Sequence, residues 1–392
     1  AVNAGGSTIH SFFLLHLCPY LPDVKELVTE YQMPESYRSL RKDRVKILRT
    51  LDLIIIDEIS MVRADLLDAV DMTLRRYRRS DKPFGGVQLL MIGDARQLSP
   101  VVKESERQCM EQVYPSPYFF HSKALRRLQY ITIEFEKVYR QQDLEFLDIL
   151  NAVRENRLEG ELLRKLNSRV GAACGNGNAD DTSEPIRLMT HNRQADDVNS
   201  RKLDALPGEA VSFAAEVEGD FPENSYPADE MLVLKKGSQV MFIRNDSEGR
   251  FYNGKIGRVE SFDSDDSVTV SDADGNLISV QPVEWQNIKY ALDEEFGEIK
   301  QNIIGQFRQL PLRIAWAITI HKSQGLTFDR VTIDAGAAFA FGQVYVALSR
   351  CRTLEGISLD SPISPSAIYS DSDVSLFDES ATPQEELQNN LQ

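Results

Sequence analysis

The sequence predicts an α/β fold with two domains, each built on a parallel sheet with flanking helices, and a small β-rich insertion in the second domain. Three observations predict it. A chain of 392 residues is too long for one ordinary hydrophobic core. Continuous apolar strands alternate with amphipathic helices in two parts of the chain. From residue 232 to residue 311, short alternating segments are broken by glycines instead.

The first domain is predicted from a strand, a helix and a second strand. Residues 51–57, LDLIIID, form a continuous apolar run that is typical of a buried parallel strand. The helix that follows has one apolar face, made of Leu66, Leu67, Val70, Leu74 and Tyr77. It ends at the loop 82–86, and residues 87–94, VQLLMIGD, form the second strand. Because ligands of such sheets bind at the carboxyl ends of the strands, the acids that end both strands are site candidates.

The second domain shows the same alternation of apolar strands and amphipathic helices. Its expected helix is LEFLDILNAVR, residues 144–154, and its expected strands are QYITIEF (129–135), PIRLMT (185–190), RIAWAIT (313–319) and DRVTID (329–334). The insertion is expected to contain the strands VMFIRN (240–245), GRVESF (257–262), SVTVSD (267–272) and LISVQP (277–282). Residues 14–50 show no strand pattern and are expected to be a short helical insertion in the first domain.

The charge balance limits the possible partners. The net charge of −16 argues against bulk electrostatic binding of duplex DNA, although a local groove for a single strand is compatible with it. The acidic end of the chain, residues 366–392, is expected to be disordered. The basic run at residues 75–79 is interpreted as a solvated helix face. The four cysteines form no CxxC pair, and neither a leader nor an apolar run of membrane-spanning length is seen, so a cytoplasmic protein is expected.

Two polar clusters follow the strands of the first domain. Asp57 and Glu58 end the first strand, where one acid can hold Mg²⁺ and the next can polarise a water. A solvated acidic pair is the alternative interpretation. Beyond the second strand, Asp94 is followed by Gln97, whose amide can reach a γ-phosphate. Here a simple polar loop is an equally good interpretation.

Further candidates come from arginines and from hydroxyl-rich turns. Arg140 and Arg350 could neutralise charge on a transferring phosphate, although a surface salt bridge explains either one taken alone. The turn at residues 319–325, TIHKSQG, suits phosphate contacts. Residues 5–12, GGSTIHSF, are similar in kind, with a helix N-cap at Ser7 or Thr8 as the alternative. Residues 190–192, THN, close a strand in the same manner.

Taken together and in order, these motifs are specific. They are GGSTIHSFF, IIIDEISM, GDARQL, YRQ, THN, IHKSQGLT and QVYVALSRCR. In this combination the sequence resembles the Pif-type (petite integration frequency) 5′→3′ DNA helicases of superfamily one, close to their bacterial members. RecD and Dda helicases are more distant relatives. The resemblance covers roughly residues 1 to 362.

The resemblance implies a monomeric motor made of two RecA-like domains, with ATP and Mg²⁺ as cofactors. Single-stranded DNA and duplex or fork DNA are its implied partners, in DNA repair and recombination at the bacterial nucleoid. The implied domains are 1–122 with a wedge at 14–50, 123–231 together with 312–365, an SH3-like barrel at 232–311, and the tail at 366–392. No membrane partner is implied.

The resemblance also implies roles for single residues. Glu58 activates water, Gln97 senses the γ-phosphate, and Arg140 and Arg350 are arginine fingers. Asp57 holds Mg²⁺, and the residues implied to bind the nucleotide with it are Asp94, Gln324 and Gly325. The residues implied to contact the DNA strand are Gly6, Thr8, His10, Thr190, Asn192, Thr319, His321, Lys322, Ser323, Gln343 and Tyr345.

One family motif does not occur in the 392 residues. Pif-type helicases carry GxxxxGK[ST] roughly twenty to thirty residues ahead of the Gly-Gly-x-Thr-Ile-His motif, but this chain contains no GK[ST]. We therefore expect an N-terminally shortened chain that does not hydrolyse ATP by itself. A single-strand-binding protein without catalysis and an RNA-directed helicase of superfamily one are the alternatives. The preferred DNA structure and the protein partners are left open.

Overall fold

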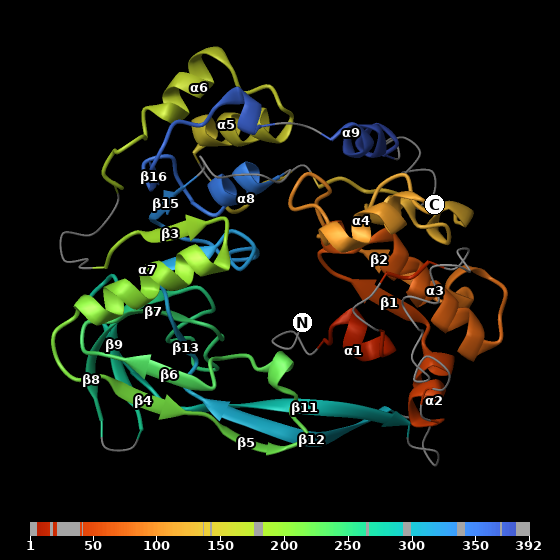
Figure 1. Cartoon of the computed structure of the whole chain (residues 1–392), viewed down its shortest axis with the longest axis horizontal. Coiled ribbons are helices and arrows are strands. Elements are labelled where there is room, and N and C mark those ends of the chain that lie inside the picture. Colours follow the sequence, from red (N-terminus) through yellow and green to blue (C-terminus); the bar gives the residue numbers. More distant parts are fainter. Residues whose placement is uncertain are drawn as a thin grey trace. The chain divides into compact units, whose positions relative to one another are not determined.

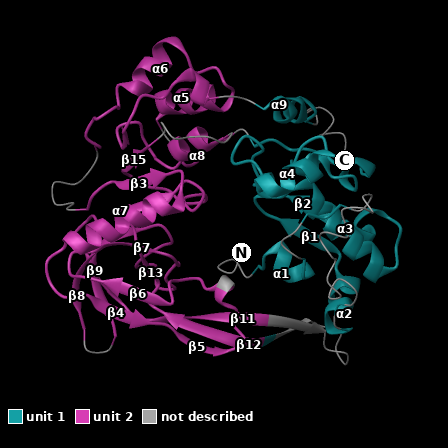
Figure 2. Cartoon of the chain, viewed as in Figure 1, with its two compact units in different colours: residues 1–136, 290–302, 370–392 teal, residues 137–289, 303–369 magenta. Residues whose placement is uncertain are grey.

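The computed structural model describes residues 6–15, 19–21, 40, 42–135, 137–141, 143–175, 183–263, 266–292, 299–334, 342–368 and 371–381. The chain divides into two compact units (Figure 2). Unit 1 comprises residues 1–136, 290–302 and 370–392, and unit 2 comprises residues 137–289 and 303–369. The domain bounds expected from the sequence stay a prediction. In the described part of the chain, no helix is both long and apolar enough to cross a bilayer.

Unit 1 is built around the strand–helix–strand arrangement that the sequence predicted. Strand β1 (Leu53–Ile56) and strand β2 (Gln88–Met91) pair in parallel, with Ile56 opposite Met91, and helix α3 (Ala64–Arg78) connects them (Figure 1). The other helices of this part of the chain are α1 (Ile9–Phe13), α2 (Lys42–Thr50) and α4 (Glu104–Glu111). Of the helical insertion expected at 14–50, helix α2 is described, whereas residues 22–39 lie outside the described residues.

One face of the β1–β2 sheet forms the core of unit 1. Ile54 and Ile56 point into a cluster that includes Leu67, Val70 and Leu74 of α3, all three of which are fully buried. The opposite face has apolar side chains that are about half exposed, namely Leu53, Ile55, Leu90 and Ile92. A parallel sheet normally has both faces covered, and among the described residues this sheet has one covered face.

The strand expected at residues 129–135 is not formed. These residues have no regular structure, and Ile131, Ile133 and Phe135 are 50%, 62% and 89% exposed. Their apolar alternation is that of a strand, but alternation alone does not satisfy backbone hydrogen-bonding groups. Within the described residues, β1 and β2 form a two-stranded sheet that does not include residues 129–135.

The basic run at residues 75–79 includes a structural arginine rather than only a solvated face. Arg78 donates through Nη1 to the carbonyl oxygens of Leu48, Arg49 and Leu51, and through Nε to that of Gly85. Carbonyls at a helix C-terminus lack partners within the helix, and those at the end of α2 find them here. Arg78 therefore ties α2 to α3. Arg76 and Arg79 are exposed, as expected.

Unit 2 contains a four-stranded parallel sheet in the order β14-β3-β15-β16. Its strands are β3 (Ile186–Met189), β14 (Ala317–Thr319), β15 (Val331–Ile333) and β16 (Ile357–Leu359). Its helices are α5 (Leu144–Arg154), α6 (Gly160–Asn167), α7 (Asn192–Ala205) and α8 (Gln343–Ser349). The predicted helix at 144–154 is confirmed with the same bounds. Helix α7 packs along β3 and β14, and α5 packs against α8 (Figure 1). Together with the parallel pair in unit 1, this confirms the predicted α/β class.

The glycine-punctuated region forms antiparallel sheets, as expected from its alternation, and these sheets also include strands at residues 211–219 and 312–314. The largest has five strands in the order β10-β9-β8-β7-β13. They are β7 (Gln239–Phe242), β8 (Ile256–Phe262), β9 (Val268–Ser271), β10 (Leu277–Val280) and β13 (Leu312–Ile314). The smaller sheets consist of β4 (Val211–Ala214) with β6 (Met231–Leu234), and of β5 (Glu216–Gly219), β11 (Val283–Leu292) and β12 (Ile299–Gln309). The SH3-like character of this region stays a prediction.

The acidic end of the chain corrects the expectation of disorder. Residues 372–379 form helix α9 (Ser372–Glu379), which belongs to unit 1. The carboxylate of Asp371 caps its N-terminus by accepting from the backbone N–H of Asp373. Val374 is 1% exposed, and the ring of Phe377 stacks on that of Phe120 at 4.6 Å. Burial of Val374 and packing of the half-buried Phe377 offset the entropic cost of ordering an acidic segment. Residues 382–392 lie outside the described residues.

Candidate functional site

The carboxyl ends of β1 and β2 bring the two acidic motifs of unit 1 to one edge of the sheet. The backbone N–H of Ile92 donates to Ile56, and that of Ile59 donates to Ile92, both at 2.9 Å. Gly93 makes this close approach possible, since a Cβ there would lie 3.0 Å from the backbone nitrogen of Ile59. Asp57 and Glu58 are therefore held next to the turn that begins at Gly93.

Glu58 occupies a strained backbone conformation. Its φ of 52° and ψ of 47° are left-handed, and the residue precedes a 3₁₀ turn at Ile59–Met61. The carboxylate of Asp57 accepts from the backbone N–H of Glu58 at 2.9 Å, which helps to hold the turn. A left-handed conformation costs an L-residue about 1–3 kcal/mol and is concentrated at functional sites. The strain therefore marks Glu58 among the acids of unit 1.

Asp57 fits a magnesium ligand. It is exposed, and its carboxylate stands at the end of a strand. Mg²⁺ usually keeps several waters and takes one or two protein carboxylates together with phosphate oxygens. Among the described residues no group of three or more histidine, cysteine, aspartate or glutamate side chains forms a metal cage. A single carboxylate of this kind suits a metal that is shared with a nucleotide.

The turn after β2 is organised by Asp94. Its two carboxylate oxygens accept from the backbone N–H of Arg96 at 3.0 Å and from the side-chain amide of Gln97 at 3.3 Å. Its carbonyl oxygen accepts from the backbone N–H of Gln97 at 3.0 Å. Asp94, expected to be a nucleotide contact, thus also orients Gln97. The guanidinium of Arg96, which was not among the expected site residues, pairs with Asp378 of α9 at 2.5 Å.

The two arginines proposed as fingers both lie in unit 2 and meet at Ser349. Arg140 is exposed and donates to the carbonyl oxygen of Ser349 at 3.3 Å. Arg350 is only 2% exposed, and it donates to the hydroxyl of Ser349 at 2.8 Å and to the carbonyl oxygen of Val346 at 3.0 Å. The structure therefore presents Arg140 to solvent and keeps the guanidinium of Arg350 inside unit 2. The surface salt bridge considered for Arg350 does not fit this burial.

Two turns predicted to contact the DNA strand lie side by side in unit 2. Thr319 pairs with Met189 in the parallel sheet, and the backbone N–H of Ile320 donates to Met189 at 2.8 Å. The turn that starts at Thr190 therefore neighbours the turn that follows Thr319. Because both follow the carboxyl ends of parallel strands, they form one polar edge of unit 2.

Within this edge, buried hydroxyls that stabilise the turn are distinguished by their exposure from groups that can contact a ligand. Thr190, Thr319 and Ser323 are 6%, 3% and 0% exposed. Ser323 donates to the carbonyl oxygen of Ile320 at 2.7 Å, and Thr319 Oγ1 accepts from the backbone N–H of Lys322 at 3.3 Å. These hydroxyls shape the turn. The expected residues that reach the surface here are Asn192, Lys322 and Gly325, with His321 and Gln324 half-buried.

The environment of His321 keeps its imidazole neutral. Burial lowers the pKa of His321 below its ordinary value, because the charged form loses hydration. The ring of the neighbouring His191 is exposed, and its Nδ1 lies 2.9 Å from the hydroxyl of Thr190. A neutral imidazole recognises a strand by hydrogen bonding rather than by charge.

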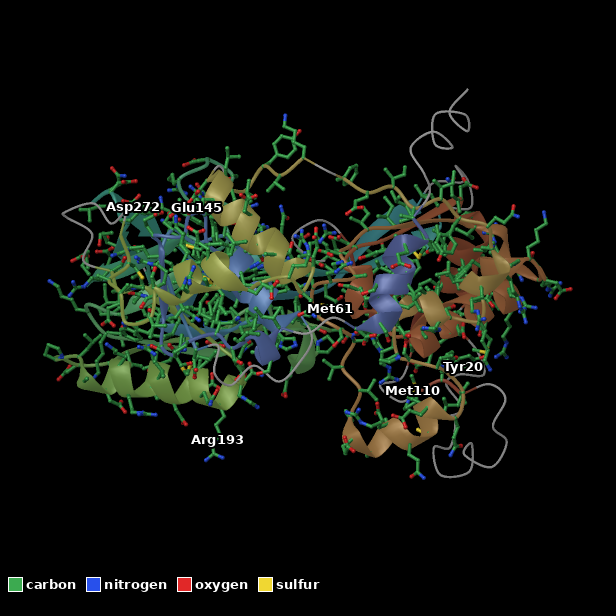
Figure 3. All side chains as sticks on the ribbon, turned by 90° about the horizontal axis from the view of Figure 1, so that it is seen from above. Tyr20, Met61, Met110, Glu145, Arg193 and Asp272 are labelled. Carbon is green, nitrogen blue, oxygen red and sulfur yellow. The ribbon has the colours of Figure 1, made fainter. Side chains whose placement is uncertain are left out.

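Sequence reasoning missed two residues of this edge. Asn199 of α7 donates to the carbonyl oxygen of Ala317 at 2.8 Å and accepts from its N–H at 2.9 Å, so it clasps β14 against the helix. Arg193, next to the THN motif, points from α7 into solvent (Figure 3). A hollow of about 280 Å³ lies beside this edge, with Asn199, Thr319 and Lys322 in its lining. Neither residue has a motif signal, because both depend on the register of α7 over the sheet.

The remaining expected residues differ in exposure and in role. Thr8 is the N-cap of α1, and its Oγ1 accepts from the backbone N–H of Ser11 at 3.2 Å, as the alternative interpretation held. The pKa of His10 is lowered first by burial and second by the charge of Arg63. Gly6 is exposed, Tyr345 is half-buried, and Gln343 at the start of α8 is fully buried.

Known proteins resemble this chain along most of its length. The family model described as PIF1-like helicase matches residues 1–161. Human ATP-dependent DNA helicase PIF1 is 37% identical over 318 residues, which cover 78% of this chain and 45% of the human protein. ATP-dependent DNA helicase Pif1 of Campylobacter jejuni is 30% identical over 362 residues, which cover 89% of this chain and 77% of that protein.

Solved structures of Bacteroides Pif1 resemble the chain as well. The complex with ADP-AlF4 is 37% identical, with a TM-score of 0.85, and covers 97% of this chain and 84% of that chain. The complex with ADP-AlF3 and single-stranded DNA has the same identity and coverage with a TM-score of 0.66. The chain spans about half the length of the human relative, but more than three quarters of the Campylobacter and Bacteroides proteins. The chain therefore belongs to the PIF1-like helicase family.

Proposed function

We propose that this chain is the motor of an ATP-dependent DNA helicase that moves 5′→3′ on a single strand and unwinds duplex DNA. The observation that carries the proposal is the edge of unit 1, where strained Glu58 and exposed Asp57 stand beside the turn of Gln97. Relatives support it, because human PIF1 is named an ATP-dependent DNA helicase and Bacteroides Pif1 binds ADP-AlF3 together with single-stranded DNA.

In unit 1 each group has a distinct task. Asp57 would hold Mg²⁺, which supplies charge neutralisation on the phosphates when it is bound. Glu58, fixed by its turn, accepts a hydrogen bond from the attacking water and orients it. Gln97, kept in place by Asp94, donates its amide toward the γ-phosphate. Positioning and electrostatics provide most of the catalysis in phosphoryl transfer, and a pre-organised edge suits that requirement.

In unit 2 the proposed tasks are charge neutralisation and strand binding. Arg140 is exposed and bonded to the Ser349 carbonyl, whereas Arg350 is buried and bonded to the Val346 carbonyl, so Arg140 is the more accessible of the two to a phosphate. The exposed amide of Asn192, the ammonium of Lys322 and the imidazole of His321 would contact the DNA backbone. In a chain of net charge −16, such contacts favour a single strand over bulk attraction to duplex DNA.

The decisive experiment is the Glu58→Gln variant in a protein that carries a GxxxxGK[ST] loop ahead of these residues. We expect ATP affinity to be retained within about twofold and DNA-stimulated turnover to fall by at least about a hundredfold, since general-base and water-orienting groups contribute that much. Glu111→Gln removes the same charge from an exposed position of unit 1 and is the control. Turnover at the parental rate by Glu58→Gln would refute the assignment.

The nature of the strand is tested separately. Stimulation of ATP hydrolysis by DNA and RNA oligonucleotides of one sequence distinguishes a DNA motor from an RNA-directed one, and we expect DNA to be the stronger stimulator. Binding of DNA without any stimulated hydrolysis would favour a strand-binding protein instead. Because relatives occur in bacteria such as Campylobacter jejuni, we also infer that the protein works on the nucleoid in the cytoplasm. Fluorescence imaging of a tagged protein beside stained DNA tests this location.

A further inference from the structure

Helix α9 is docked on unit 1 by contacts at its start and along its apolar face. The hydroxyl of Tyr118 donates to the Asp371 carboxylate at 3.0 Å, and Nε2 of His121 lies 3.3 Å from the carboxylate of Asp373. Phe377 stacks on Phe120 at 4.6 Å. Residues 118–121 of unit 1 therefore hold the helix from its N-cap to its last turn.

The last turn of α9 places an acid where it opposes the helix dipole. A carboxylate near a helix C-terminus is unfavourable, because the terminal carbonyls already carry negative partial charge. Asp378 nevertheless stands there, and its carboxylate binds Nε of Arg96 at 2.5 Å. The side chains of Arg96 and Asp378 are only 16% and 32% exposed, so this charge-assisted bond is partly shielded from water. The pairing with Arg96 gives Asp378 a role that its own helix does not supply.

Arg96 is the third of the four residues in the turn at residues 94–97, which orients Gln97. Its backbone N–H donates to one oxygen of the Asp94 carboxylate, and the amide of Gln97 donates to the other. Anchoring the side chain of Arg96 on α9 therefore restricts the backbone from which the Gln97 side chain projects. Fixing a turn at its centre as well as at its ends reduces the number of conformations available to Gln97.

We propose that Asp378 is a positioning residue for Gln97, acting through Arg96. Helix α9 holds the turn at residues 94–97 in the conformation that presents the Gln97 amide, and release of Asp378 lets that turn relax. The inference deepens the proposed function, since its catalytic consequence rests on Gln97 acting at the γ-phosphate. Its structural consequence, the order of the turn, is independent of any catalysis.

The test compares three variants. Asp378→Ala removes the carboxylate without disfavouring the helix, and Asp378→Glu keeps the charge on a longer side chain. Glu379→Ala makes the same change in charge at the neighbouring exposed position of α9, so it controls for net charge and for effects on the helix itself. Each is examined in the full protein by amide hydrogen exchange at Arg96 and Gln97, by kcat and KM for ATP, and by affinity for a DNA oligonucleotide.

For Asp378→Ala we expect exchange at the Arg96 and Gln97 amides to rise by about fivefold or more, because both bonds belong to the turn that loses its anchor. We expect kcat to fall about three- to tenfold with KM for ATP and DNA affinity unchanged, since misplacement of one catalytic amide affects turnover rather than binding. Asp378→Glu should recover most of both effects, and Glu379→Ala should show neither.

The outcomes separate this inference from the proposed function. If a parent protein that carries the GxxxxGK[ST] loop lacks DNA-stimulated hydrolysis, the proposed function fails, and the exchange measurement alone decides whether Asp378 orders the turn. Unchanged exchange in Asp378→Ala overturns the inference whatever the activity. Faster exchange with an unchanged kcat in an active parent also overturns it, because the turn would then be ordered without consequence for Gln97. Equal effects of Glu379→Ala would attribute the change to charge and not to Arg96.

Discussion

The side-chain amide of Gln141 donates to the carbonyl oxygen of Ser349 at 3.0 Å. It also donates to the carbonyl oxygen of Cys351 at 3.1 Å, so one buried amide caps the end of helix α8. Arg140 donates to the same Ser349 carbonyl, and Arg350 donates to the Ser349 hydroxyl. The YRQ motif and the end of the QVYVALSRCR motif are thus tied together through Ser349, although they are far apart in the sequence.

Replacement of this amide should cost stability. Gln141→Ala removes the amide donor of the Cys351 carbonyl and one of the two donors to the Ser349 carbonyl, and we expect the free energy of unfolding to fall by about 1–3 kcal/mol. Urea denaturation of unit 2, followed by tryptophan fluorescence, measures the change. Gln286→Ala, which removes an exposed amide bonded to Glu284, is the control and should change stability by less than about 0.5 kcal/mol. Equal losses in the two variants would contradict a specific role for the Ser349 contact.

The two arginines should differ in what their loss does to the fold. Both Arg140→Ala and Arg350→Ala are expected to lower kcat by about a thousandfold, with DNA affinity little changed, if they act as fingers. Only Arg350→Ala should also lower the free energy of unfolding, since its buried guanidinium bonds Val346 and Ser349. Steady-state kinetics, strand binding and thermal melting are measured on each variant. If either variant lost only DNA affinity and kept its kcat, the arginine would be assigned to DNA contact and not to catalysis.

The sequence predicted those features that depend on local periodicity. Strands β1 and β3 and helix α5 follow continuous apolar or amphipathic runs, and each was found where the run lies. Residues 129–135 have an equally clear alternation and form no strand, because pairing depends on a neighbouring strand and not on the segment itself. Helix α9 was missed for the opposite reason. Its acidic composition predicted disorder, because the stabilising contribution of Val374 and Phe377 depends on the residues that they pack against.

For the site, the order of the motifs identified the polar edges of the two sheets. It did not predict the exposure or the hydrogen-bond partners of each side chain. Asp57 and Lys322 are exposed, as a ligand-binding role requires. Thr8, Ser323 and Arg350 use their polar atoms on backbone groups of their own unit. A motif indicates which residue types are needed, whereas burial and capping depend on tertiary packing that the motif does not encode. Arg96 had no motif signal at all, since its partner lies in α9.

The salt dependence of strand binding should be shallow. Few basic side chains stand at the polar edge of unit 2, with Lys322 and Arg193 exposed there. The logarithm of the binding constant falls with the logarithm of the salt concentration, with a slope of about −0.7 for each phosphate neutralised on a single strand. We expect a total slope that corresponds to about two to four such contacts. Lys322→Ala should reduce the slope by about 0.7 in titrations from low to moderate salt. Arg79→Ala, which removes an exposed charge of the basic run in unit 1, should leave it unchanged, and a change there would place that run on the DNA.

Stability should fall on mild acidification because of His321. Its pKa is lowered in the fold by burial, whereas in the unfolded chain it titrates near the ordinary value of about 6.5. As the pH falls through that value the unfolded state gains a proton that the folded state does not, so unfolding becomes easier until the folded pKa is reached. Urea unfolding between pH 7.5 and pH 5.5 measures the trend. His321→Gln should show a weaker pH dependence than the parent, and an equal dependence would exclude His321 as its source.

The strain at Glu58 leads to a prediction that separates stability from activity. Its left-handed backbone, with φ at 52°, suits glycine better than glutamate. Glu58→Gly should therefore raise the free energy of unfolding by about 0.5–1 kcal/mol relative to Glu58→Gln, although both variants lose turnover. Arg79, at the C-terminal cap of α3 with φ at 53°, is the matched control, and Arg79→Gly should stabilise similarly without loss of turnover. Denaturation curves and DNA-stimulated ATP hydrolysis are compared for the three variants and the parent. If Glu58→Gly is less stable than Glu58→Gln while Arg79→Gly is stabilised, the turn at Glu58 is held by side-chain contacts of the glutamate, and the strain argument is wrong.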